Sequence, residues 1–241
     1  MLRKLICLNK DDLMLYAGVN FGVFLLLQII MCVVMVLLFP CDAIMVSHIL
    51  MLVVSAICMF SQGVAHVNFT YVQALQFSQN RKRAMGLLLK LVVFETVFAM
   101  AIVSLLAWVE RNLCPYLWMA FAGAEGYAIS GGNGYAAIRG GNIEGVTLWI
   151  DAFVLTEWWW TPLVLGVAAV LGIITGALIQ RFGRAGGWGL WGLWMLVCVG
   201  GPRLDWKHHT ILDWALPLAG VVILIAFVWS IWSLLRATVK N

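Results

Sequence analysis

Long apolar runs separated by short polar segments dominate this chain. A helix needs about 20 apolar residues to cross the hydrocarbon core of a bilayer. Strands of a membrane barrel would alternate with a period of two, whereas these runs are continuously apolar. The pattern therefore predicts an all-α integral membrane protein with six transmembrane helices, at residues 16–39, 43–66, 84–109, 161–180, 185–201 and 214–235. The fifth run is short and rich in glycine, so a tilted or re-entrant element is the alternative there.

The composition supports a single membrane domain over residues 1–241. The chain is 63% hydrophobic and 11% charged, against roughly 25% charged residues in a soluble domain. A soluble fold of this length could not hide so much apolar surface in one core. The sequence leaves little for a second domain.

The distribution of lysine and arginine predicts that both termini lie inside the cell. With the N-terminus inside, the outer segments hold Arg111, Arg139, Arg203 and Lys207, and the other 11 of the 15 cations fall on the inner side. Inner loops of membrane proteins carry this excess of positive charge. We therefore expect a multi-pass membrane protein in contact with membrane lipid. The cations are scattered over separate loops, so no nucleic-acid partner is expected.

The largest segment outside the predicted spans is the outer region 110–160. Residues 123–145 are rich in glycine, which predicts turns or a mobile loop. Residues 146–160 place polar side chains among Leu, Trp, Ile, Phe and Val. This spacing predicts an amphipathic helix on the outer membrane surface. The region is also where a ligand or a partner would bind if the protein were a membrane scaffold or sensor.

No pattern in the chain predicts catalysis or a bound metal. A Walker A motif is absent from the sequence, so ATP cannot be hydrolysed here by that route. No spacing forces a Ser-His-Asp or Cys-His set. The six cysteines lack the spacing of metal ligands. Cys41 and Cys114 both fall on the predicted outer side, but nothing in the sequence sets the distance between them, so their pairing stays open. A membrane enzyme that uses Glu95 or the outer acids ranks third among the interpretations.

Glu95 is the one acid inside a predicted span. An ionised carboxylate is costly in lipid, so it is a candidate for a proton relay or a substrate contact. The alternative is a protonated or hydrogen-bonded side chain that faces a neighbouring helix, opposite Gln28.

Two further sets of residues have a helical spacing. Gly172 and Gly176 are four residues apart, which lets two helices approach closely, either within one subunit or between subunits. Trp188, Trp191 and Trp194 share one face of the fifth run. They either pack against lipid and helices or form an aromatic wall along a substrate path.

A short basic segment separates the second and third runs. It reads Phe-Ser-Gln-Asn-Arg-Lys at residues 77–82, followed by Arg83 and then by Met-Gly at 85–86. This pattern resembles permease subunits of bacterial type-2 ABC exporters in their small six-helix form. The segment at residues 180–188, Gln-Arg-Phe-Gly-Arg-Ala-Gly-Gly-Trp, is similar to the same family.

The resemblance implies a location in a bacterial cell membrane and a mechanism. Two permease subunits, in a homodimer or a heterodimer, would pair around a path for an amphipathic substrate such as a peptide, a drug or a lipid. A cytosolic subunit would bind and hydrolyse ATP with Mg, so this chain is itself not an enzyme and carries no cofactor. Phe77, Arg81, Lys82 and Arg83 would contact that subunit. The alternative is that the three cations only hold the loop inside.

Overall fold

The computed structural model describes residues 10–38, 43–45, 47–77, 80–121, 126–130, 134–139, 142–150, 159–183, 185–189, 192, 195 and 209–236. The chain divides into two compact units. Unit 1 comprises Met1–Ile57 and Glu95–Leu165, and unit 2 comprises Cys58–Phe94 and Gly166–Asn241. The prediction of a single membrane domain is not tested by this division, because three long helices run from one unit into the other.

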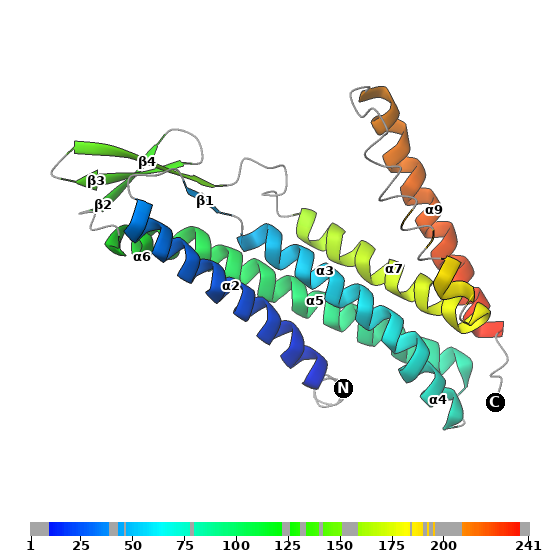
Figure 1. Cartoon of the computed structure of the whole chain (residues 1–241). Coiled ribbons are helices and arrows are strands. Elements are labelled where there is room, and N and C mark those ends of the chain that lie inside the picture. Colours follow the sequence, from blue (N-terminus) through cyan, green and yellow to red (C-terminus); the bar gives the residue numbers. More distant parts are fainter. Residues whose placement is uncertain are drawn as a thin grey trace. The chain divides into compact units, whose positions relative to one another are not determined.

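Five long helices dominate the described residues (Figure 1): α2 (Lys10–Leu38), α3 (Ser47–Ala65), α5 (Arg81–Asn112), α7 (Trp160–Phe182) and α9 (His209–Arg236). Within the described part of the chain, four helical segments are long and apolar enough to cross a membrane: Lys10–Leu37, Ser47–Gln76, Arg81–Asn112 and Trp160–Phe182. They match the first four predicted spans and indicate a multi-pass membrane protein whose spanning part is helical.

The last two predicted spans are not among these four segments. The fifth, 185–201, lies largely outside the described residues. The sixth falls within α9, whose stretch Gly220–Arg236 is an apolar helix shorter than the four candidates. Six spans, and the placing of both termini inside, therefore stay predictions.

The second spanning segment is longer than a bilayer requires. It joins α3 to a π-helical turn, η1 (His66–Tyr71), and then to the short helix α4 (Val72–Gln76). Its 30 residues extend over about 45 Å at 1.5 Å per residue, against about 30 Å for the hydrocarbon core. One end of this segment must therefore project beyond the core.

Unit 1 has a buried cluster contributed by four helices. Its members come from α2, α3, α5 and α6 (Cys114–Phe121): Phe24, Met35, Met51, Val103, Leu106, Cys114 and Trp118. Trp118 and Met35 are fully buried. Because lipid is as apolar as these side chains, their close packing, and not escape from water, holds the helices together.

A four-stranded sheet belongs to unit 1. Its strands are β1 (Ala43–Met45), β2 (Gly126–Ser130), β3 (Gly134–Arg139) and β4 (Asn142–Ile150), in the order β1-β4-β3-β2. β1 is parallel to β4, and the other pairs are antiparallel (Figure 1).

The sheet corrects the predicted outer surface helix. The structure has β4 at residues 146–150, so the helix is wrong there, and residues 151–158 lie outside the described part. Apolar Val146, Leu148 and Ile150 recur at every second position, which is the period of a strand. Much of the segment predicted as glycine-rich turns also forms strands, namely β2 and β3.

In unit 2, α7 packs very closely against α3. A Cβ atom built on Gly172 would lie 2.5 Å from the carbonyl oxygen of Phe60 and 3.0 Å from the Cα of Gly63. One built on Gly176 would lie 2.7 Å from the Cβ of Val67 in η1. The two glycines predicted to line a helix interface therefore do so between helices of this chain.

Candidate functional sites

The basic segment between α4 and α5 exposes an aromatic side chain and two cations. Phe77 follows α4 directly and is 81% exposed. Lys82 and Arg83, in the first turn of α5, are exposed as well. Asn80 fixes the start of this helix, because its Oδ1 accepts a hydrogen bond from the Lys82 backbone N–H at 3.3 Å. Phe77, at the end of α4, and Lys82 and Arg83, at the start of α5, are therefore all exposed, and we call these three residues the corner between the two helices.

Arg81 differs from its neighbours because it is engaged inside the chain. Its Nη1 donates to the backbone oxygen of Leu235 at 3.2 Å. The Tyr71 hydroxyl donates to the oxygen of Leu234 at 2.8 Å. Both carbonyls belong to the last turn of α9, where carbonyls lack partners within the helix. Arg81 therefore caps α9, and the exposed members of the predicted partner contact are Phe77, Lys82 and Arg83.

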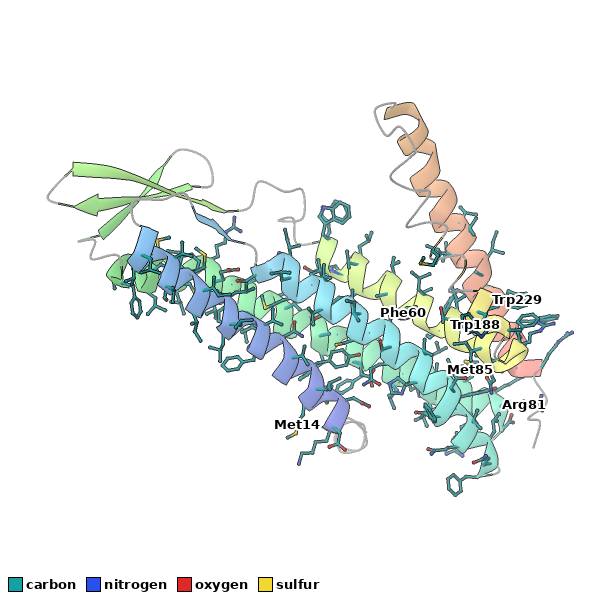
Figure 2. The ribbon with its side chains drawn as sticks, viewed as in Figure 1. Met14, Phe60, Arg81, Met85, Trp188 and Trp229 are labelled. Carbon is teal, nitrogen blue, oxygen red and sulfur yellow. The ribbon has the colours of Figure 1, made fainter. Side chains whose placement is uncertain are left out.

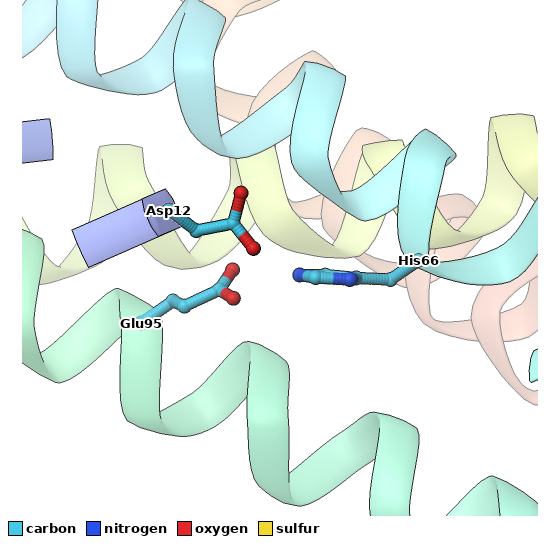
Figure 3. Close-up of side chains that lie close together, drawn as sticks. All are labelled: Asp12, His66 and Glu95. Carbon is cyan, nitrogen blue, oxygen red and sulfur yellow. The ribbon is translucent and has the colours of Figure 1, made fainter. Parts of the chain in front are cut away.

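Glu95 is fully buried on α5. Its carboxylate lies within 4.8 Å of that of Asp12, on α2 of the same unit (Figure 3). Carboxylate oxygens are ligands that hard cations prefer, so the pair offers two such ligands close together. Figure 3 also draws His66, which belongs to unit 2, where its Nδ1 lies 3.2 Å from Thr70 Oγ1. The predicted role of Glu95 as a proton site or substrate contact stays a prediction.

Gln28, expected opposite Glu95, bonds instead to a different acid. Its Nε2 donates to Ser47 Oγ at 3.2 Å and to Glu110 Oε1 at 3.4 Å. Glu110 also accepts hydrogen bonds from the side chain and backbone of Ser47 and from the backbone of His48. Gln28, Ser47 and Glu110 are all buried. They form a polar network at the first residues of α3.

The apolar runs of the sequence place Glu110 in the outer region, so its burial was not predicted. A signal was nevertheless present. The buried positions of α5 recur every three or four residues through Glu95, Ala99, Val103 and Leu106. The next position on this face is residue 110, which helical periodicity places with the buried side chains.

The remaining predicted residues divide by whether the structure describes them. Trp188 is 70% exposed, whereas Trp191 and Trp194 lie outside the described residues. Cys41 also lies outside them. Cys114 is a buried free cysteine at the start of α6. Burial, helped by the nearby Glu110 and Cys32, raises the pKa of its thiol to about 11.

No protein-family model, curated protein or solved structure matches this chain. The resemblance to exporter permeases therefore rests on the short motifs of the sequence.

Proposed function

We propose that this chain is the permease subunit of an ABC transporter of the type-2 exporter class. It exports an amphipathic substrate (a peptide, a drug or a lipid) with ATP hydrolysed by a separate cytosolic subunit. The observation that carries the proposal is the corner formed by Phe77, Lys82 and Arg83. It joins two long apolar helical segments, and it exposes the side chains that the family motif assigns to contact with the ATPase.

The geometry supports a docking role for this corner. The segment Ser47–Gln76 exceeds the thickness of the hydrocarbon core, so α4 and Phe77 can project from the membrane. Exposed aromatic and arginine side chains are the residue types that dominate binding energy at protein interfaces. Arg81, which belongs to the same basic segment, is hydrogen-bonded to the end of α9. A movement of this segment would therefore be transmitted to a second long helix.

The test distinguishes a role of this corner in coupling to the ATPase subunit from a role of its positive charges in setting membrane orientation. Phe77→Ala removes the aromatic anchor and leaves every charge in place, so membrane orientation is unaffected. We expect it to lower stimulation of the ATPase subunit by roughly tenfold. The charge reversal Lys82→Glu/Arg83→Glu should abolish stimulation. If both variants insert normally and still stimulate the ATPase fully, the proposed coupling surface is wrong.

A second candidate function is a membrane scaffold or sensor that binds a ligand or partner through residues 110–160. The observation in its favour is the sheet β1-β4-β3-β2, since a folded sheet offers a defined surface. Replacing residues 126–150 by a short Gly-Ser linker distinguishes the two. A permease should keep its stimulation of the ATPase, whereas a sensor should lose its response.

A further inference from the structure

Three arginines surround the last turn of α9 in unit 2. Arg81 donates to Leu235 O from the start of α5. Arg181, near the end of α7, donates to Ser233 Oγ at 3.4 Å, and its guanidinium carbon lies 5.0 Å from the Trp229 ring centroid. The guanidinium carbon of Arg236 lies 4.0 Å from the Trp232 ring centroid. Arg81 and Trp229 lie at the same end of this unit (Figure 2).

Capping of α9 does not account for all three cations. Arg81 and the Tyr71 hydroxyl already bond the carbonyls of Leu235 and Leu234. Arg181 and Arg236 lie over aromatic rings instead, and both side chains are exposed. A guanidinium carries five N–H donors in a planar fork. Arg181 uses one of its donors in the bond to Ser233 Oγ, and the exposure of Arg181 and Arg236 makes both guanidinium groups accessible to an anion.

Among the described residues of unit 2, no acid lies near this turn. The sole acid among the described residues of unit 2 is Asp213. It lies close to the start of α9, about 34 Å along the helix axis from Arg236. The end of α9 is therefore a concentrated positive patch.

The flanking residues indicate which anion fits the patch. Phe182 is 52% exposed and Trp232 is 48% exposed, and Trp229 lies under Arg181. Tryptophan is enriched where head groups meet acyl chains. Arginine binds phosphate through two parallel hydrogen bonds. Basic pockets between membrane helices on the cytoplasmic side suit anionic lipid head groups, and the predicted topology places this end inside.

We propose that Arg181 and Arg236, beside the α9 cap made by Arg81, bind the phosphate of an anionic phospholipid. Trp229, Trp232 and Phe182 lie against the glycerol and upper acyl region of the same lipid. This inference does not depend on an ATPase partner, so it can fail or hold independently of the proposed function.

The experiment is a lipid titration followed by native mass spectrometry of the purified full chain in a neutral detergent. Wild type should retain phosphatidylglycerol at concentrations at which phosphatidylcholine is lost. Arg181→Gln/Arg236→Gln should weaken phosphatidylglycerol retention by roughly tenfold or more and leave phosphatidylcholine retention unchanged. Arg181→Lys/Arg236→Lys keeps the charge without the planar fork and should give an intermediate result.

The matched control removes the same charge elsewhere. Lys82→Gln/Arg83→Gln neutralises two exposed cations of the neighbouring basic segment and should change retention less than about threefold. An equal loss in both double variants would mean a general surface charge effect and overturn the site. Displacement of the lipid by millimolar inorganic phosphate would show that soluble phosphate is the ligand and also overturn it. If the double variant is misfolded by circular dichroism, Arg236→Gln alone is used, and unchanged retention then contradicts the proposal.

Discussion

The start of α3 and the end of α9 show two uses of one electrostatic rule. At the start of α3, the buried Glu110 accepts bonds from the backbone of Ser47 and His48. At the end of α9, Arg81 donates to the carbonyl of Leu235. The N-terminal end of a helix carries a partial positive charge and the C-terminal end a partial negative charge. In both places a side chain of opposite charge bonds to backbone groups that have no partner within the helix. The two sites differ in whether charged side chains remain exposed and able to bind a further partner.

Glu110 directs its interactions inward. Glu110 is 4% exposed, and its carboxylate accepts hydrogen bonds from Gln28, Ser47 and the backbone of His48. The end of α9 instead carries two additional arginines that are exposed and lie over tryptophan rings. The difference indicates that a buried cap serves stability, whereas a partly buried cap beside two exposed arginines can also serve binding.

The largest expected effect is loss of the buried cap. Glu110→Ala would leave buried donors of Gln28, Ser47 and His48 without an acceptor, and we expect it to lower the free energy of unfolding by about 3 kcal/mol. Thermal unfolding in detergent measures this. Glu110→Gln keeps an acceptor oxygen and the side-chain volume, so its cost should be smaller. An unchanged melting temperature for Glu110→Ala would contradict the proposal that Glu110 stabilises the fold.

The next effect concerns packing that involves no charge. Gly172→Ala places a methyl group 2.5 Å from the Phe60 carbonyl oxygen, and we expect a cost of about 2 kcal/mol. Gly166 is the matched control on the same helix, because a Cβ there meets nothing within 4 Å. Gly166→Ala should be neutral or stabilising, since alanine favours helix. Equal melting temperatures for the two variants would contradict the close approach of α7 and α3.

A smaller effect is expected at the Arg81 cap of α9. Arg81→Ala removes one partly buried hydrogen bond to Leu235 and should cost about 1 kcal/mol. The loss should be local, so hydrogen exchange should speed up in the last turn of α9 and not at the start of α3. Lys82→Ala, at an exposed neighbouring position, is the control. Faster exchange in both variants would mean that the basic segment acts on α9 through general charge.

The smallest expected effect is a change in the reactivity of the Cys114 thiol, which lies near Glu110. With a thiol pKa of about 11, roughly a thousandth of the side chain is thiolate at pH 8, so maleimide should label it slowly. Labelling should rise with pH up to that pKa, because deprotonation generates the reactive form. In a variant with the other five cysteines replaced by alanine, Glu110→Gln should speed labelling by removing a nearby negative charge. Fast labelling at pH 8 in the parent would mean that the thiol is neither buried nor near Glu110.

The sequence predicted the spanning helices better than their polar contacts. The continuous apolar runs at residues 16–39 and 84–109 correspond to α2 and α5, because helices in lipid must be apolar along most of their length. The strand β4 was predicted as a helix over 146–150 although its apolar residues alternate. Helical periodicity places position 110 on the buried face of α5, but the bond between Glu110 and Gln28 depends on the register of α5 against α2, which no local pattern shows. Nor does any local pattern reveal that Arg81 reaches Leu235, 154 residues away in sequence.

Purification of the complex tests the central claim most directly. The native chain, carrying a small C-terminal tag and extracted in mild detergent, is purified and its stoichiometric partners are identified by mass spectrometry. The proposed function predicts a partner with a Walker A motif and ATP hydrolysis that depends on the Phe77, Lys82 and Arg83 corner. Transport by the purified chain in the absence of any ATPase subunit would contradict it.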